Sequence, residues 1–406
     1  MLFQVLDDKS ECVGVYCEGS LYFNERDFPP TLTQTWKYSS SLRHLPGVEY
    51  ANLYLEGMSI EEALPEYLQD DWEDVQRQLN SFVRSLKISK VDMADHCIYD
   101  LTPTRFLLEY GAVRDQMTQY VLDSRTRPAR YDYLLKVNQL LCSLGDTPLK
   151  INHRRLNSLG GSPAEVASLS RLKKSSPYLH YNQFGTRTGR LTTEKRSFPI
   201  LTMKREHRQI IEPHNDSFIE LDFNGAEART ALGIAGIEQP QGDVHEFHAQ
   251  HIFEGQYDRG EVKTAFFGWL YGSRATTTAE HSKRLSSFYD REVILKKYWD
   301  GDRVVTPYKK VIKEVDSHHA LNYIIQSTTA ELTLLQALKI DYFLRTHHCA
   351  TRVACLIHDA IVLDFCDDDK DHLGALCELM SSTTFGKYVI NISKGPNLGS
   401  LKKMGL

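Results

Sequence analysis

Residues 258–273 read DRGEVKTAFFGWLYGS and place Arg259, Lys263, Phe267 and Tyr271 at intervals of four. Residues four apart lie on one face of an α-helix, so this spacing predicts a helix that carries two cations and then two aromatic rings along one face. Cations meet phosphates and aromatic rings stack on bases. The pattern therefore favours a helix that binds a nucleoside triphosphate.

Local signals predict both ends of this helix. Asp258 is a suitable N-cap with Glu261 as its capping-box partner, and Gly272 is typical of a C-terminal stop. Val262 and Phe266 belong to a second stripe that can be buried against the rest of the domain. The alternative is an ordinary amphipathic helix with two solvated cations, and the other motifs of the chain decide between the two.

The chain of 406 residues has room for two or three domains or one large, subdivided domain. Its 41% hydrophobic and 25% charged residues are typical of a globular protein. No apolar run approaches the ~18–20 residues that span a bilayer. The N-terminus reaches acidic residues too early for a secretory signal. We therefore expect no membrane association.

The formal net charge of -5 hides a segregation of charge along the chain. Residues 56–75 contain eight acidic residues and no Lys or Arg, whereas residues 184–208 contain seven Lys or Arg against two Glu, a net of +5. The basic segment is a plausible phosphate track, with a solvated loop as the alternative. The acidic segment could dock a basic partner, keep nucleic acid away, or simply be a solvated face.

Hydrophobic periodicity predicts a mixture of helices and strands. A β-hairpin is expected within 2–23, acidic helices within 59–88 and long helices within 103–145. Further along we expect a strand at 217–223, helices at 225–235 and 326–345, and two strands at 352–359 and 360–365.

Two aspartates fall at the ends of predicted strands. Asp222 lies where a strand gives way to a helix, and Asp359 lies at the turn between two strands. Two carboxylates at the rim of a buried sheet can hold a pair of divalent ions ~3.5–4 Å apart. Mg²⁺ suits such a site because it prefers hard oxygen ligands and shares its shell with substrate phosphates. The alternative is that Asp222 is only an N-terminal helix acid and Asp359 only a turn acid.

Glu227 also has two interpretations. Asn224 could cap the helix at 225–235, and Glu227 would then take the capping-box position. The functional interpretation is that Glu227 occupies space beside the sugar of a bound nucleotide.

Together these segments resemble the motifs of the family A (DNA polymerase I-like) DNA polymerases, in a phage-like form. The resemblance extends from about residue 138 to the C-terminus, and the order of the motifs is more specific than any one of them. The matching segments are TRTGRLTT (186–193) with the family's TGRLSS, LDFNGAEART (221–230) with motif A, GDVHEFHA (242–249) with D-x-H-x-x-x-A, residues 259–272 with motif B (R-x3-K-x3-F-x3-Y-G), LNYIIQSTTAE (321–331) with N-x-x-x-Q-x-x-A-A-D, and LIHDAIVL (356–363) with motif C.

The resemblance implies an α+β fold of the right-hand polymerase type, with an antiparallel palm sheet, helical fingers and a short thumb. By this analogy, residues 1–100 form an N-terminal region of unclear role. The other expected regions are a helical thumb-like region at 101–187, a palm at 188–243 and 316–406, and fingers at 244–315.

The resemblance also implies template-directed DNA synthesis by the two-metal reaction, with two Mg²⁺ ions for which Mn²⁺ can substitute. The expected partners are primer–template DNA, dNTPs and a processivity or replisome protein, in the cytoplasm of a bacterial or phage-infected cell. The resemblance implies metal binding and catalysis by Asp222 and Asp359 with the Phe223 carbonyl, and triphosphate binding by Arg259, Lys263 and His245. It implies that Phe267 packs on the incoming base and sugar, that Tyr271 lies near the template base and that Glu227 excludes a ribose 2′-hydroxyl. The implied primer–template contacts are Arg190, Arg229, Asn322, Gln326 and His358.

The chain departs from the family pattern in three ways. Ala360 follows Asp359 where the family usually has Glu, and we still expect activity because that Glu is not usually a core metal ligand. Only 36 residues separate Asn152 from Thr188, which is short for a family thumb. Residues 1–100 lack an ordered set of exonuclease carboxylates, so we predict no 3′–5′ exonuclease.

Two other functions compete with this interpretation. A single-subunit RNA polymerase shares the palm, both aspartates and a motif B that ends in Tyr-Gly, but Glu227 and Phe267 fit the DNA-polymerising branch. An inactive polymerase fold that serves as a DNA-binding or replisome scaffold would explain Ala360 and the acidic segment. It would leave the retention of Asp222, Asp359, Arg259 and Lys263 unexplained.

Overall fold

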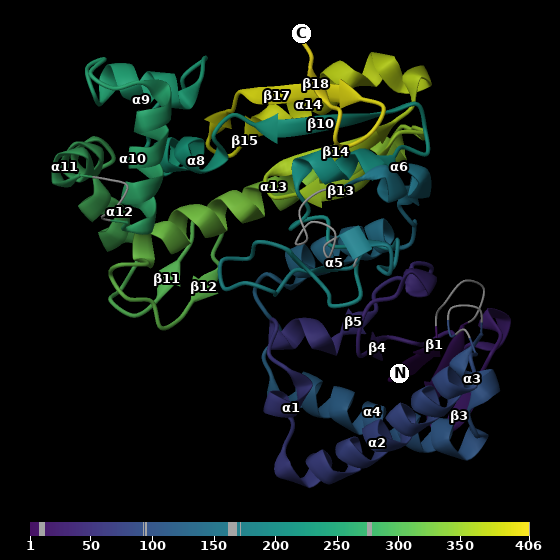
Figure 1. Cartoon of the computed structure of the whole chain (residues 1–406). Coiled ribbons are helices and arrows are strands. Elements are labelled where there is room, and N and C mark those ends of the chain that lie inside the picture. Colours follow the sequence, from purple (N-terminus) through teal and green to yellow (C-terminus); the bar gives the residue numbers. More distant parts are fainter. Residues whose placement is uncertain are drawn as a thin grey trace. The chain divides into compact units, whose positions relative to one another are not determined.

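The computed structural model describes residues 1–406 apart from 8–12, 92, 94–95, 161–168, 171, 274–277 and 406. The chain divides into two compact units, Met1–Ser143 and Leu144–Leu406 (Figure 1). This boundary falls inside 101–187, the range predicted to be one helical region. The division arises because the long helix α4 (Thr104–Ser124) packs within the first unit, against α2 (Glu66–Ile88) and the N-terminal strands.

The first unit combines a small antiparallel sheet with helices. The hairpin predicted within 2–23 is present and gains a third strand, in the order β1-β2-β3. The acidic α2 buries Leu68, Trp72 and Val75 against Val113 and Met117 of α4, which leaves its charged face in solvent. The elements are β1 (Gln4–Asp7), β2 (Gly14–Cys17), β3 (Ser20–Tyr22), β4 (Gln34–Thr35), β5 (Glu49–Tyr50), α1 (Ile60–Ala63), α2, α3 (Ile98–Leu101), α4 and α5 (Tyr131–Gly145), which crosses the boundary.

A five-stranded sheet lies at the centre of the second unit, with the strand order β13-β14-β10-β17-β18 and antiparallel pairing throughout. This sheet confirms the predicted α+β class. The strands predicted at 217–223, 352–359 and 360–365 are all present. The strands are β10 (Ser217–Phe223), β13 (Arg352–Ile357), β14 (Ala360–Phe365), β17 (Ile390–Gly395) and β18 (Lys402–Lys403).

Register in this sheet decides which side chains share an end and a face. In β10, Ile219 and Leu221 are fully buried, whereas Glu220 and Asp222 alternate with them on the opposite face. Asp222 pairs with Ala360 of β14 on one side and with Asn391 of β17 on the other. The end of the sheet therefore presents these three residues in one row.

Helices gather beyond this end of the sheet, and α13 (Ala320–Thr346) runs from them along the sheet (Figure 1). The 27 residues of α13 extend for ~40 Å. Phe266, Trp269 and Leu270 pack with Tyr289 and Ile324 in one buried cluster that joins α8 to α13. The other helices of this group are α8 (Ala226–Ile234), α9 (Val244–His251), α10 (Arg259–Tyr271), α11 (Ala279–Phe288) and α12 (Arg291–Tyr298).

Short elements complete the second unit as two-stranded ladders and small helices. Among the described residues, no helix is both long and apolar enough to cross a membrane. The remaining elements are β6 (Lys150–Ile151), α6 (His153–Ser158), β7 (Tyr181–Asn182), β8 (Thr192–Thr193), β9 (Ile211–Glu212), β11 (Val304–Val305), β12 (Val311–Ile312), α14 (Leu373–Ser381), β15 (Ser382–Thr383) and β16 (Gly386–Lys387).

Candidate active site

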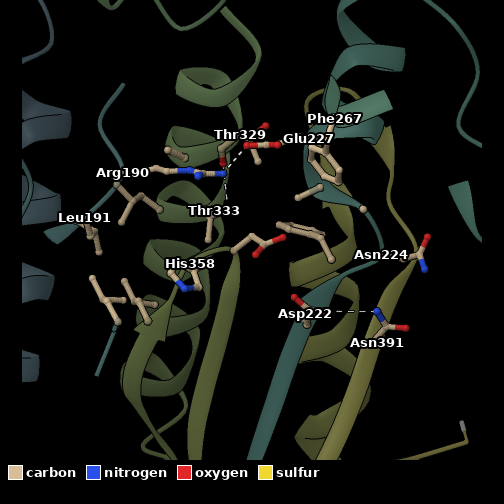
Figure 2. Close-up of a pocket in the computed structure, with 18 of the residues that line it drawn as sticks. Arg190, Leu191, Asp222, Asn224, Glu227, Phe267, Thr329, Thr333, His358 and Asn391 are labelled. Atoms are coloured by element: carbon tan, nitrogen blue, oxygen red, sulfur yellow. Dashed lines mark hydrogen bonds and ion pairs between the residues drawn. The ribbon is translucent and has the colours of Figure 1, made fainter. Parts of the chain in front are cut away.

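A cavity of about 720 Å³ opens at the end of the sheet that carries Asp222 (Figure 2). It collects side chains from the segment 186–191, β10, α8, α10, α13 and the β13–β14 turn. Eleven of the fourteen predicted site residues line it, namely Arg190, Asp222, Phe223, Glu227, His245, Arg259, Lys263, Phe267, Tyr271, His358 and Asp359.

The two aspartates are brought together by the sheet. Asp359 immediately precedes Ala360, and Ala360 is the register partner of Asp222 across β10 and β14. The turn between β13 and β14 is only His358-Asp359, because Ile357 already pairs with Ala360. His358 has a left-handed φ of 57°, a conformation that costs a non-glycine residue ~1–2 kcal/mol and often marks a functional site.

Burial disfavours the charged form of both carboxylates. Burial raises the pKa of Asp222 and the nearby Asp359 raises it further, so that it moves from 3.8 to about 7. Burial likewise raises the pKa of Asp359, although Arg190 and Lys263 oppose the shift. Two desolvated carboxylates side by side are poorly compensated without a cation, and this arrangement fits divalent metal ions.

Asn391 contacts the first of these carboxylates. Its Nδ2 lies 3.4 Å from Asp222 Oδ2, and this hydrogen bond lowers the pKa of Asp222 against the larger effect of burial. Figure 2 shows the side chain approaching Asp222 from the neighbouring strand β17. Asn391 thus fixes one oxygen of Asp222.

Glu227 is the centre of a network that joins three other segments. The Arg190 guanidinium forms an ion pair with its carboxylate (Figure 2), and the Tyr271 hydroxyl donates to both carboxylate oxygens at 3.3 and 3.2 Å. Gln326 Nε2 in turn donates to the Tyr271 oxygen at 3.3 Å. Burial raises the pKa of Glu227, while Arg190 and Tyr271 lower it. Glu227 therefore connects α8, α10, α13 and the segment around Arg190.

The capping-box interpretation of Glu227 is wrong. The N-cap of α8 is Gly225, with φ 65°, and no side chain caps the helix there. Asn224 does not cap α8: its Oδ1 accepts from the Val244 N–H, and its Nδ2 donates to Asp243. Glu227 is consequently free to face the cavity.

Helix α10 has the ends that the sequence predicts. The capping box of Asp258 and Glu261 is present, and Gly272 ends the helix in the left-handed conformation with φ 70°. The Phe267 and Tyr271 rings stack with an interplanar angle of 18°, so the aromatic half of the face is continuous.

The cationic half of α10 is tied to the neighbouring helix. The Arg259 guanidinium donates to Asp243 Oδ2 at 2.6 Å, and Asp243 is the N-cap of α9. Lys263 and His245 line the cavity beside it. Burial lowers the pKa of His245 to about 4, so at neutral pH this imidazole is an uncharged hydrogen-bonding group rather than a cation.

The three remaining predicted residues do not line the cavity. For Arg229 the predicted DNA contact is wrong, because its guanidinium is completely buried and donates to the backbone oxygens of Asn224, Pro240 and Gly242. Gln326 reaches the site through Tyr271, to whose oxygen its Nε2 donates. Asn322 lies one turn earlier on α13 and is partly buried.

The sequence interpretation also missed residues that line the cavity. Thr329 and Thr333 continue the face of Asn322 and Gln326 along α13 at helical spacing, so the periodicity of that helix could have identified them. Asn391 carried no such signal, because its place beside Asp222 depends on the pairing of two strands far apart in sequence.

Comparison with known proteins points to one family. No family model matches the chain. The chain is 22% identical over 275 residues to DNA polymerase I of Chloroflexus aurantiacus, 25% over 281 residues to that of Aquifex aeolicus, and 20% over 330 residues to that of Lactococcus lactis subsp. lactis. These matches cover 56%, 60% and 69% of the chain but only 29%, 48% and 38% of the relatives. The chain is thus similar to the family A DNA polymerases over more than half of its length.

The fold is also similar to that of a solved polymerase domain. The polymerase domain of Pol1 from M. smegmatis, solved in complex with DNA primer-template and dNTP, is similar with a TM-score of 0.66. The match covers 98% of this chain and 96% of that domain at 13% sequence identity. The predicted right-hand polymerase fold is thus confirmed, although the chain spans less than half the length of the curated relatives.

Proposed function

We propose that the chain is a template-directed DNA polymerase that extends a primer 3′ end with dNTPs by two-metal phosphoryl transfer, without 3′–5′ exonuclease activity. The observation that carries this proposal is the cavity in which Asp222 and Asp359 face the cations and rings of α10. That combination places groups suited to metal-bound phosphates beside groups suited to a base.

Two carboxylates are enough for Mg²⁺, and their oxygens are the ligands that this ion prefers. Among the described residues, no group of three or more His, Cys, Asp or Glu side chains is arranged to hold a metal ion. Mg²⁺ commonly binds through one or two carboxylates and completes its shell with water and substrate phosphates. Asp222 and Asp359, with the Phe223 carbonyl, would hold two such ions, and Mn²⁺ would substitute. When bound, the metals lower the pKa of the primer 3′-hydroxyl and stabilise the leaving pyrophosphate.

The chain's own groups have separate tasks in this reaction. Arg259 and Lys263 bind and neutralise the triphosphate, and neutral His245 adds a hydrogen bond. Phe267 packs on the incoming base and sugar. Tyr271 lies near the template base, held by its hydrogen bonds to Glu227 and Gln326.

Sugar selection is proposed for Glu227. The residue is 6% exposed and lines the cavity, and its carboxylate is fixed by Arg190 and Tyr271, so it can exclude a ribose 2′-hydroxyl rather than move aside. Arg190, His358, Asn322 and Gln326 are assigned to primer–template contacts.

The regions of a right hand are part of the same proposal. Residues 188–243 and 316–406 would form the palm, and 244–315 the fingers. Residues 101–187 would form the helical thumb-like region, and within this range α4 packs in the first unit. The short stretch between Asn152 and Thr188 favours a processivity or replisome protein as an additional partner.

Primer extension with Mg²⁺ tests the proposal. We expect the purified chain to extend a primer with dNTPs in preference to rNTPs, Asp222→Asn to abolish extension, and Glu227→Ala to admit rNTPs. Equal use of rNTPs by the unsubstituted chain would favour an RNA polymerase. Binding of DNA without any extension would favour the scaffold, and metal-dependent removal of a mismatched primer end would contradict the absence of an exonuclease.

A further inference from the structure

Asp243 accepts hydrogen bonds from three separate segments of the chain. Its Oδ1 accepts from the backbone N–H groups of His245 and Glu246 at 2.9 and 3.1 Å, and thereby caps α9. Its Oδ2 accepts from Asn224 Nδ2 at 3.0 Å and from the Arg259 guanidinium at 2.6 Å. One carboxylate thus joins the residue that follows β10, the start of α9 and the start of α10.

The loop that carries Asp243 is itself held in place. The buried Arg229 guanidinium donates to the backbone oxygens of Pro240 and Gly242 at 2.9 and 2.6 Å, and to that of Asn224 at 2.8 Å. The Arg229 guanidinium therefore joins this loop to Asn224, the residue that follows β10. This explains why an arginine in a motif that otherwise faces the cavity is completely buried.

The ion pair is partly sheltered from water. The side chain of Asp243 is 17% exposed and that of Arg259 is 47% exposed. Burial raises the pKa of Asp243, but the donors from Arg259, Asn224 and two backbone groups outweigh it, and the net pKa lies below the usual range. The carboxylate is therefore ionised at neutral pH. A guanidinium has five N–H donors, so one end of Arg259 can bind Asp243 while the rest faces an anion in the cavity.

We propose that Asp243 is a positioning residue that acts through Arg259: it holds the guanidinium at the mouth of the cavity, oriented for a nucleoside triphosphate. This inference rests on the proposed function. An unrestrained arginine loses side-chain entropy each time it binds a phosphate, whereas an arginine held by a carboxylate has already lost it. Removal of Asp243 should therefore weaken nucleotide binding more than it slows the chemical step.

Two substitutions separate this role from helix capping. Asp243→Ser keeps a good N-cap for α9 but removes the second oxygen, which contacts Arg259 and Asn224. Asp243→Asn keeps the shape and the cap but removes the charge. We expect either variant to raise the KM for dNTP about tenfold, the scale of one charge-assisted hydrogen bond, while kcat changes by less than about threefold.

A double-mutant cycle with Arg259→Ala decides whether Asp243 acts through the arginine. In that background, Asp243→Ser should raise the KM no further, because the residue it positions is already absent. The matched control is Asp258→Ser, the same change at the N-cap of α10, where the carboxylate accepts from the Gly260 and Glu261 N–H groups rather than from Arg259. We expect the control to leave the KM for dNTP unchanged.

Several outcomes would overturn the inference. An unchanged KM for dNTP in both Asp243 variants would refute the positioning role. A lowered KM for dNTP would show that the carboxylate competes with the triphosphate for Arg259. A full effect of Asp243→Ser in the Arg259→Ala background would reduce Asp243 to a helix cap. An unsubstituted chain that fails to extend primers would refute the proposed function and this inference together, whereas an active chain with unchanged variants refutes only the inference.

Discussion

The two halves of the cavity are held in place by different forces. Asp222 and Asp359 stand at the end of a five-stranded sheet, where their separation follows from strand register and a two-residue turn. Arg259 and Lys263 stand on the cavity side of α10, which buries Phe266 and Trp269 on its other side and is tied to its neighbours at Arg259 and Tyr271 by polar contacts.

The aspartates of the sheet half are therefore held rigidly, whereas the side chains of the helix half can adjust. Many backbone hydrogen bonds would have to break before the aspartates could move apart. The polar contacts of α10 are few, and a bound nucleotide can compete for each of them. We infer that the sheet half sets the rate of the chemical step and that the helix half sets nucleotide affinity, and substitutions in the two halves should therefore have different kinetic signatures.

The largest expected effect is on the sheet half. Asp359→Asn should lower kcat for primer extension on the order of 10³-fold with little change in the KM for dNTP, because it removes a charge that we propose binds metal in the transition state. Single-turnover extension with saturating Mg²⁺ measures it. Lys263→Ala serves as the comparison and should act mainly on the KM. If the two variants shared one kinetic signature, the separation of the halves would be wrong.

Sequence reasoning succeeded where local rules decide the structure. The caps and the four-residue face of α10 depend on neighbours in sequence, and β10 was predicted with the bounds that the structure has. Asp222 and Asp359 could be chosen because each ends a strand, which is also a local property. Their pairing was predicted from their place at the rim of a buried sheet, and strand register is what brings them together.

The failures share a physical cause. Arg229 was assigned to DNA by its match to motif A, but the carbonyl oxygens of Pro240 and Gly242 accept from its guanidinium, which is buried. Asn391 and Asp243 were not identified because their contacts with Asp222 and Arg259 are formed by residues distant in sequence. Long-range hydrogen bonds of this kind leave no periodicity or spacing in one sequence.

A second prediction concerns the stability cost of the paired aspartates. Because the pKa of Asp222 is raised from 3.8 to about 7, Asp222 stays protonated in the folded protein between these pH values, where the unfolded chain has released that proton. The stability from this group is present below pH 3.8 and is lost as the pH rises to about 7. Without divalent metal, Asp222→Asn should therefore be more stable than the unsubstituted chain at pH 8, by about 1–3 kcal/mol more than at pH 4.5.

Denaturant unfolding with chelator at the two pH values measures this difference. Mg²⁺ should narrow the gap at pH 8, because the ion compensates the paired charges in the unsubstituted chain and binds the variant more weakly. A gap that does not depend on pH would show that the buried carboxylate titrates near its ordinary pKa. The sheet half would then lack the electrostatic cost that we attribute to it.

The smallest expected effect tests how far the sheet alone fixes Asp222. Asn391→Leu removes the 3.4 Å hydrogen bond to Asp222 Oδ2 but preserves the approximate size of the side chain. If register already determines the position of Asp222, the loss of one long hydrogen bond should lower kcat only about threefold and raise the Mg²⁺ requirement by a similar factor. Titration of Mn²⁺ binding to the free protein separates metal affinity from turnover, and Asn391→Asp should strengthen that binding by adding a charge. A loss from Asn391→Leu as large as that from Asp359→Asn would mean that side-chain contacts hold the sheet half of the site as well as the helix half.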